Sequence, residues 1–177
     1  DGPAGGATKS GGRHTRKDRS AFGEQVRRPR PNAAFGADLI AGFPTETESM
    51  FQQSMDLVDD AGLTNLHVLP FSARNGTPAA RMPQLARSEI KERAARLRAK
   101  GDAATECRRL SLVGSLQPLL VERRGMGRSE CLAPVVVEEA REAGSFVRAS
   151  IVAATGGELR ADRAACASSE KRRRRPP

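Results

Sequence analysis

A run of glycine, proline and acidic residues from Gly42 to Glu48 joins an apolar segment to a predicted helix. In parallel α/β proteins, ligands bind at the carboxyl ends of strands, where a glycine allows close approach and the N–H groups at the start of a helix are free. A strand, a glycine and a capped helix also form a common structural junction. The spacing therefore indicates a candidate cofactor-binding turn and leaves a purely structural role open.

Two ionisable side chains interrupt apolar segments. Asp38 lies in FGADLIAGF (35–43) and His67 lies in LHVLPF (66–71). A buried carboxylate is costly unless it is paired or hydrogen-bonded. Asp38 is therefore either a polar contact for a ligand at the end of a strand or a structural partner for a backbone group or an arginine. His67 is more typical of a hydrogen-bonded core residue than of a ligand or a base.

Five arginines are candidates for contacts with phosphate groups. They are Arg74 in a turn-rich loop, Arg123 and Arg124 in a turn, and Arg128 and Arg148 on or near predicted strands. Each could equally be a solvated surface charge. The chain has no Trp and no Tyr, and we expect no aromatic platform for base stacking in its second half. Any contact with RNA should therefore be mainly to phosphate and to shape.

The three cysteines, Cys107, Cys131 and Cys166, stand far apart in the sequence. A zinc or iron–sulfur site would need clustered ligands such as CxxC, and the even count of a disulfide framework is missing. We expect ordinary reduced thiols of a cytoplasmic protein. No nucleophile elbow, P-loop or HExxH motif is present.

The first region, residues 13–104, alternates strand and helix signals. Buried strands are predicted at 35–43 and 66–71, with a helix between them that a Thr45-x-x-Glu48 capping box opens and Gly62 ends. A second helix should begin at a Ser88 cap and end at Gly101, with Glu89/Arg93 and Glu92/Arg96 as pairs on its surface. This βαβα order implies parallel strands. Because two such strands are too few for a stable sheet, we expect part of a larger α/β domain.

The second region, residues 105–161, is predicted to be all β. LQPLLVE (116–122), CLAPVVVE (131–138) and SFVRASIVAA (145–154) have strand character, and a glycine turn at Gly125 and Gly127 follows the first. In the third segment Val147, Ala149, Ile151 and Ala153 share one face, and Gly156-Gly157 indicates a hairpin. Several short strands within some 50 residues suggest a small barrel.

The formal net charge of +9 belongs to the two ends of the chain. Residues 1–35 carry an excess of +5 and residues 158–177 an excess of +4, whereas the middle is neutral. Basic ends attract nucleic acid without reading its sequence, but they are also typical of solvated tails. We expect residues 1–12 and 162–177 to be disordered, and we find neither a signal peptide nor a membrane-spanning stretch.

Specific strings carry a family resemblance. In chain order they are RHTRKDRSAFGEQVRRPRP (13–31), GADLIAGFPTETESMF (36–51), LHVLPFSARNGTPAARMPQ (66–84), IKERAARLRA (90–99), LLVERRGMGRSECLAPVVV (119–137) and GSFVRASIVAATGGELRA (144–161). Together they resemble the carboxy-terminal part of the radical-SAM tRNA methylthiotransferases, MiaB-like and MtaB-like. The branch that modifies threonylcarbamoyladenosine is the closer likeness.

The resemblance implies an α/β fold, part of a TIM-like radical-SAM barrel over 13–104, followed by a TRAM-like RNA-binding β-domain over 105–161. It implies S-adenosylmethionine (SAM) and [4Fe-4S] clusters as cofactors and the anticodon arm of tRNA as partner. Carried over to this chain, Ile40, Gly42, Glu46 and Phe71 would lie near SAM, and Arg74, Arg123, Arg124, Arg128 and Arg148 would meet RNA. The chain departs from the family in lacking CxxxCxxC and in having Ala73 and Asn75 where prolines are usual.

The function that the resemblance implies is insertion of a methylthio group into a modified adenosine beside the anticodon. Without cluster ligands this chain alone should be inactive, and the missing amino-terminal domains of such an enzyme would be its partners. Two other readings stay open: a TRAM module that binds RNA without catalysis, and a degenerate fragment with a broken sheet edge.

Overall fold

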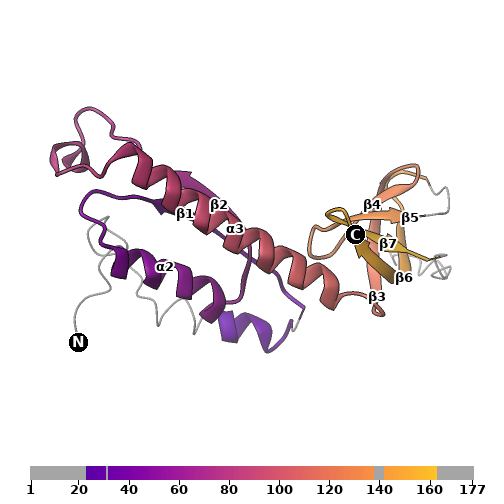
Figure 1. The fold of residues 1–177 in the computed structure, drawn as a ribbon. Coiled ribbons are helices and arrows are strands. Elements are labelled where there is room, and N and C mark those ends of the chain that lie inside the picture. The colour runs from indigo at the N-terminus through magenta and orange to yellow at the C-terminus, as the bar shows by residue number, and fades with distance from the viewer. Residues whose placement is uncertain (1–22, 31, 138–141, 163–177) are drawn as a thin grey trace, which may run out of the picture. The chain divides into compact units, whose positions relative to one another are not determined.

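A computed structural model describes residues 23–30, 32–137 and 142–162. The predicted tails, apart from residue 162, and Cys166 lie outside these residues. The chain divides into two compact units between Thr105 and Glu106. The elements, drawn in Figure 1, are β1 (Phe35–Ala41), α2 (Glu48–Asp60), β2 (Leu63–Pro70), the 3₁₀ helix η1 (Pro78–Arg81), α3 (Arg87–Ser111), β3 (Leu116–Arg123), β4 (Met126–Ser129), β5 (Pro134–Val137), β6 (Phe146–Thr155) and β7 (Glu158–Ala161).

The first unit is built on a parallel pair of strands. β1 and β2 pair in register from Gly36 with Asn65 to Ala41 with Pro70, and α2 connects them. One face of the pair packs against both helices, which run beside it in Figure 1. The core consists of Ala41, Phe51, Val58, Ala61, Leu63, Val68, Ala94 and Leu97. The expected parallel βαβ order is confirmed for these strands.

The other face of β1 and β2 is uncovered, and the prediction of two fully buried strands was wrong. Exposure alternates along both strands, so that Ile40 is 53% exposed and Leu69, its partner in the ladder, is 39% exposed. A parallel sheet is normally covered on both faces. A two-stranded sheet with helices on one side leaves its second face to solvent.

Helix α2 begins two residues later than the capping box predicted. Thr47 is the N-cap, and its hydroxyl oxygen accepts a hydrogen bond from the Met50 N–H at 3.2 Å. Thr45 cannot serve because it lies in the left-handed region, with φ 67°, inside a turn that the Glu46 N–H closes by bonding to the carbonyl of Phe43. The stop is as predicted: the Gly62 N–H bonds to the Asp59 carbonyl.

Helix α3 does not end at Gly101 and does not begin at a Ser88 cap. It runs for 25 residues from Arg87 to Ser111. Gly101 is buried inside it, where a Cβ atom would lie 3.0 Å from Cβ of Leu66. The glycine therefore serves close packing of α3 on β2, which outweighs its poor helix propensity of about 1 kcal/mol.

The second unit contains a closed barrel of five strands in the order β3-β4-β5-β7-β6. The small β-barrel expected from the sequence is therefore present. The hairpin at Gly156-Gly157 is confirmed by pairing of Thr155 with Glu158. Gly127 was wrongly assigned to a turn: it pairs with Val121 inside β4, and a Cβ there would lie 2.6 Å from the Leu120 carbonyl oxygen.

Alternate residues of these strands fill the barrel together with Leu112, which follows α3. The core consists of Leu112, Leu119, Val121, Val135, Val137, Val147, Ala149, Ile151, Leu159 and Ala161. Three of the four β6 residues predicted on one face are buried. The fourth, Ala153, follows an irregularity in the pairing with β7 and is only partly buried.

Candidate functional site

The segment after β1 is a tight turn held from both sides. Gly42 has φ 78°, and a Cβ on it would lie 2.8 Å from Cγ1 of Ile90, so only glycine fits. Its N–H donates to the Glu46 carboxylate at 3.0 Å. The predicted cofactor-binding residues Gly42 and Glu46 are thus brought together, and they bond to each other.

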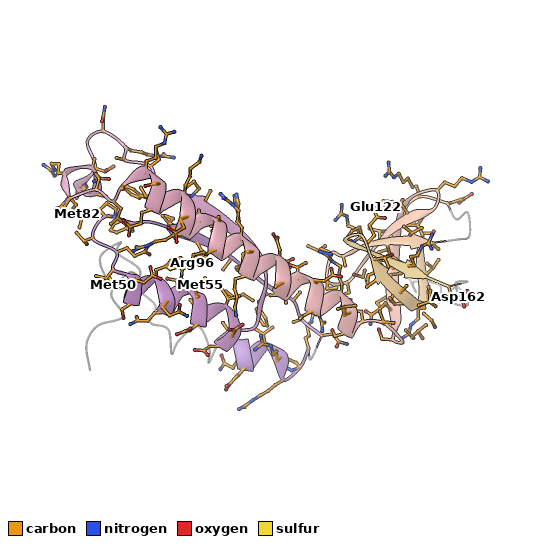
Figure 2. All side chains as sticks on the ribbon, in the orientation of Figure 1. Met50, Met55, Met82, Arg96, Glu122 and Asp162 are labelled. Carbon is orange, nitrogen blue, oxygen red and sulfur yellow. The ribbon has the colours of Figure 1, made fainter. Side chains whose placement is uncertain are left out.

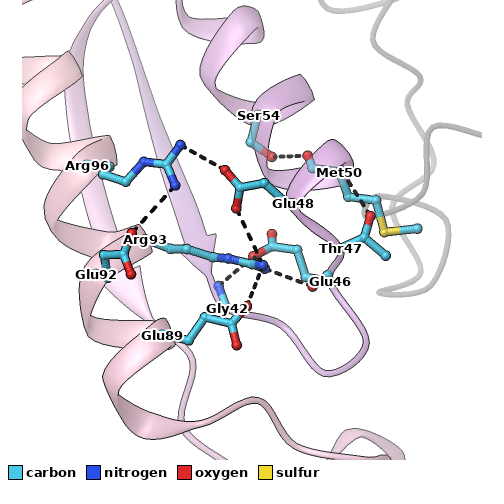
Figure 3. Close-up of polar contacts among 10 residues, drawn as sticks. All are labelled: Gly42, Glu46, Thr47, Glu48, Met50, Ser54, Glu89, Glu92, Arg93 and Arg96. Carbon is cyan, nitrogen blue, oxygen red and sulfur yellow. Dashed lines mark hydrogen bonds and ion pairs between the residues drawn. The ribbon is translucent and has the colours of Figure 1, made fainter.

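Arg93 of α3 holds this turn in place through hydrogen bonds and ion pairs, which Figure 3 shows. One terminal nitrogen donates to both the backbone carbonyl and the carboxylate of Glu46, each at 2.8 Å. The other donates to Glu89 at 2.6 Å and lies 3.7 Å from Glu48. The Arg93 and Glu46 side chains are only 4% and 10% exposed. The Glu46 carboxylate is therefore satisfied within the protein.

Sequence reasoning assigned Arg93 to the helix surface, and this was wrong. The predicted pair with Glu89 exists, but the guanidinium is buried and lies over the Phe51 ring, 5.5 Å from its centre. The predicted Glu92/Arg96 pair is present at 3.8 Å, and Arg96 also reaches Glu48 at 2.8 Å. The signal available in the sequence was that Ala94 and Leu97 flank Arg93 on the apolar side of the helix.

Asp38 and His67 lie opposite each other on the uncovered face of the sheet. The Asp38 carboxylate is 3.4 Å from Nδ1 of His67, and the side chains are 77% and 71% exposed. The prediction that both are buried was wrong, because each points away from the helices. The partner of Asp38 is His67, neither a backbone group nor an arginine. Ile40 lies on the same face, two residues after Asp38.

Phe71 and Arg74 follow β2. The Phe71 N–H donates to the Ala41 carbonyl, which extends the strand pairing by one residue. The rings of Phe71 and Phe43 pack edge to face, with their centroids 5.4 Å apart. Phe71 is thus brought beside the turn. Arg74 lies in an exposed loop in which its carbonyl accepts hydrogen bonds from the N–H and the hydroxyl of Thr77.

The barrel carries the other predicted arginines on its outer surface. Arg123 and Arg124 are exposed where β3 turns into β4, and Gly125 there has φ 77°. Long side chains with nitrogen at their ends project around the labelled Glu122 in Figure 2. Arg128 differs because its Nε lies 2.7 Å from the Glu122 carboxylate. Arg148 is exposed on β6, opposite Pro118.

One exposed aromatic was missed. Phe146, the first residue of β6, is 75% exposed on the outside of the barrel. It is an exposed ring in the half of the chain where the sequence predicted no aromatic platform for base stacking. The signal was in the sequence: Phe146 is out of phase with the buried Val147, Ala149 and Ile151.

Metal ligands do not gather in the described part of the chain. No group of three or more His, Cys, Asp or Glu residues there could hold a metal ion. Cys107 and Cys131 are free thiols. Within the same residues no helix is long and apolar enough to cross a membrane.

Comparison with known proteins bears on both units. The chain is 38% identical over 148 residues to the threonylcarbamoyladenosine tRNA methylthiotransferase MtaB of Rickettsia prowazekii. The matched segment covers 84% of this chain and 35% of that protein. It is 32% identical over 158 residues to the tRNA-2-methylthio-N(6)-dimethylallyladenosine synthase of Cereibacter sphaeroides, covering 85% and 36%. No family model matches the chain.

Both relatives are named as enzymes that modify tRNA. More narrowly, the chain is a relative of the tRNA methylthiotransferases of the MtaB and MiaB types, as its motifs indicated. It spans about a third of the length of these two relatives.

Proposed function

We propose that this chain is the carboxy-terminal part of a tRNA methylthiotransferase, in which the barrel binds the anticodon arm of tRNA. The observation that supports this most is the closed barrel with exposed arginines at one hairpin, in a chain related to MtaB and MiaB. Within the described residues, Arg123 and Arg124 enter no ion pair. Exposed arginines without acidic partners suit phosphate contacts. The whole enzyme would work in the cytoplasm.

The substrate we favour is threonylcarbamoyladenosine next to the anticodon. Its support is the 38% identity to a relative named for that nucleoside, against 32% for the dimethylallyladenosine synthase of Cereibacter sphaeroides. A relative named for the second nucleoside, in Mycobacterium marinum, also reaches 38% identity, but over a shorter span of 120 residues. The longer match is the reason for the preference.

The first unit would contribute one wall of a SAM site. Ile40 is apolar and exposed on the open face of the sheet, which suits contact with an adenine ring. Gly42, Glu46 and Phe71 would border the site. Since the Gly42 N–H and the Glu46 carboxylate bond to each other, they would act by fixing the shape of the turn. Bound SAM would supply the radical chemistry of the whole enzyme; these residues would only hold it.

The [4Fe-4S] clusters of the family do not fit the described residues. A cluster needs several clustered thiolates, and Cys107 and Cys131 belong to no group of potential ligands there. The ligands would come from elsewhere in the enzyme. An upstream coding sequence with CxxxCxxC roughly 150 residues before residue 36 is expected at typical domain sizes. An in-frame stop codon there would contradict the enzyme and favour the RNA-binding module.

Binding of an anticodon stem–loop to the full chain tests the barrel. Fluorescence anisotropy over a series of salt concentrations gives the affinity and its salt slope. Replacing Arg123 and Arg124 together by alanine should weaken binding and reduce the slope by about 1.4 to 1.8, because two phosphate contacts are lost. The matched control replaces the exposed Arg81 and Arg87 of the first unit, with the same change in net charge.

The control pair should lower the slope far less than the hairpin pair does. Equal losses in both variants would mean that only net charge matters, and the assignment of the hairpin would be wrong. Absence of any salt-dependent binding by the unchanged protein would overturn the proposed function as a whole.

A further inference from the structure

The outside of the barrel carries a row of apolar residues with one arginine among them. Phe146 on β6 lies opposite Leu120 on β3, Leu120 lies opposite Arg128 on β4, and Arg128 lies opposite Pro134 on β5. Residues directly opposite in antiparallel strands share a face. We call Phe146, Leu120 and Arg128, together with Arg148, the stacking strip.

Phe146 has no structural reason to be aromatic in this position. Its side chain contributes nothing to the buried core, which the alternate residues of β6 supply. No ring contact or cation–π contact holds it among the described residues. A large ring that is 75% exposed and makes no such contact is accessible to a partner outside the barrel.

Two arginines share the outer face of the barrel with this ring. Arg148 follows Phe146 on the same strand and face, about 7 Å along the strand. It forms no ion pair with any described residue. Two strands away, across Leu120, lies Arg128, whose guanidinium is turned toward Glu122 and the Leu132 carbonyl. An aromatic ring beside Arg148, a cation without an ion pair among the described residues, fits a ligand with both a flat ring and negative charge.

We propose that Phe146 stacks on an unpaired nucleobase of RNA and that Arg148 binds the phosphate next to it. This inference rests on the proposed RNA-binding function of the barrel and adds to it a base-contacting residue. Single-stranded nucleic acid is bound in general by aromatic rings for the bases beside cations for the backbone. Stacking is tolerant of base identity, so the strip would read an unpaired state and not a sequence.

Binding of a fluorescent anticodon stem–loop with 2-aminopurine in its loop tests the strip on the full chain. Phe146→Ala should lower affinity about 5- to 150-fold and leave the salt slope unchanged, because no charge is lost. It should also remove the quenching of 2-aminopurine that stacking causes. Arg148→Ala should reduce the slope by about 0.7 and leave most of the quenching in the bound state.

Two further variants separate stacking from mere apolar contact. Phe146→Trp should keep affinity and quenching, whereas Phe146→Leu should bind as weakly as Phe146→Ala. Val152→Ala is the matched control, because Val152 lies on the same strand and outer face and is 53% exposed. It should bind like the unchanged protein. All variants should keep the melting temperature of the unchanged protein, since the altered side chains are outside the core.

The outcomes separate this inference from the function on which it rests. If the unchanged protein binds RNA with a salt slope but Phe146→Ala binds equally well, the stacking strip is wrong and the proposed function stands. Binding by Phe146→Leu at full strength would also refute stacking. A fall in melting temperature without loss of affinity would assign Phe146 to a protein contact and overturn the inference. No RNA binding by the unchanged protein would overturn both.

Discussion

Replacing Arg93 by methionine should destabilise the first unit far more than the same change at Arg96. Both arginines lie on α3 one turn apart, both lie over the Phe51 ring, and both pair with acidic residues near the start of α2. They differ in burial: the Arg93 side chain is 4% exposed and that of Arg96 is 39% exposed. The comparison therefore isolates the effect of burying the ion pair.

The magnitude follows from what each substitution leaves behind. Methionine keeps much of the apolar stem of Arg93 but leaves the Glu46 carboxylate, 10% exposed, without its cation. Removing one partner of a buried pair costs about 3–5 kcal/mol. The partner of Arg96, Glu48, is 59% exposed, so solvent screens that pair and its loss costs about 0–1 kcal/mol.

Urea denaturation followed by the helical circular dichroism signal measures the difference. With a slope of about 1–3 kcal/mol per molar urea, the Arg93→Met midpoint should fall by at least about 0.7 M relative to Arg96→Met. Coinciding midpoints for the two variants would refute the reasoning. A loss of several kcal/mol can unfold a domain outright, so a rescue variant is needed as well.

Adding Glu46→Gln to Arg93→Met provides that rescue. The glutamine carbonyl still accepts the hydrogen bond from the Gly42 N–H, but no unpaired charge stays buried. The double variant should therefore be more stable than Arg93→Met alone, by about 1 kcal/mol or more. A double variant no more stable than Arg93→Met would mean that lost packing, and not an unpaired carboxylate, explains the effect.

Four further substitutions are each tested by urea denaturation. Thr47→Ala should lower the free energy of unfolding by about 1 kcal/mol because it removes the N-cap of α2. Thr45→Gly should raise it by up to about 1 kcal/mol, because a β-branched residue at positive φ is strained and glycine is not. Gly101→Ala should destabilise by about 1–3 kcal/mol through overpacking on Leu66, and should stabilise when Leu66→Ala has made room. Gly127→Ala should unfold the barrel, because its Cβ would meet a backbone carbonyl that cannot move aside.

Each of these has an outcome that would count against it. If Thr45→Gly lowered the free energy of unfolding more than Thr47→Ala did, Thr45 would be the N-cap of α2, as the sequence predicted. If Gly101→Ala alone raised the free energy of unfolding, Leu66 on β2 would have to move aside for the added Cβ, and the overpacking argument would be wrong. Gly114→Ala is the control for the barrel, since Gly114 has φ 83° but open space around it. It should cost only about 1–2 kcal/mol.

Local patterns predicted the elements of this chain well where one signal dominated. The alternation around Val147 and Ile151 and the glycine pair at Gly156-Gly157 are period-two and turn signals, and both correspond to the observed β6–β7 hairpin. The same patterns failed where a distant residue decides the outcome. The local pattern predicts a helix stop at Gly101, whereas the reason for a glycine there is the close approach of Leu66, which lies 35 positions earlier in the chain.

The candidate site shows the same division. Gly42 and Glu46 were identified from a strand-to-helix turn, but their partner Arg93 lies 47 positions after Glu46, on the next helix. Charge pairs at a spacing of four predict Arg93 on the helix surface, whereas its apolar neighbours Ala94 and Leu97 indicate the buried side. Phe146 was missed for the opposite reason, since a count of aromatic residues says nothing of which face each occupies.

The Glu46–Arg93 pair also bears on how the turn could take part in ligand binding. A carboxylate that already holds the Gly42 N–H and a buried guanidinium has little capacity left for a ligand. What remains open at this end of the unit is the apolar Ile40 on the uncovered face of β1, beside the Asp38–His67 pair. The turn is therefore better suited to hold the end of β1 rigid than to bind directly. On this argument Arg93→Met would disturb any ligand on that face through the backbone, although its side chain touches none of it.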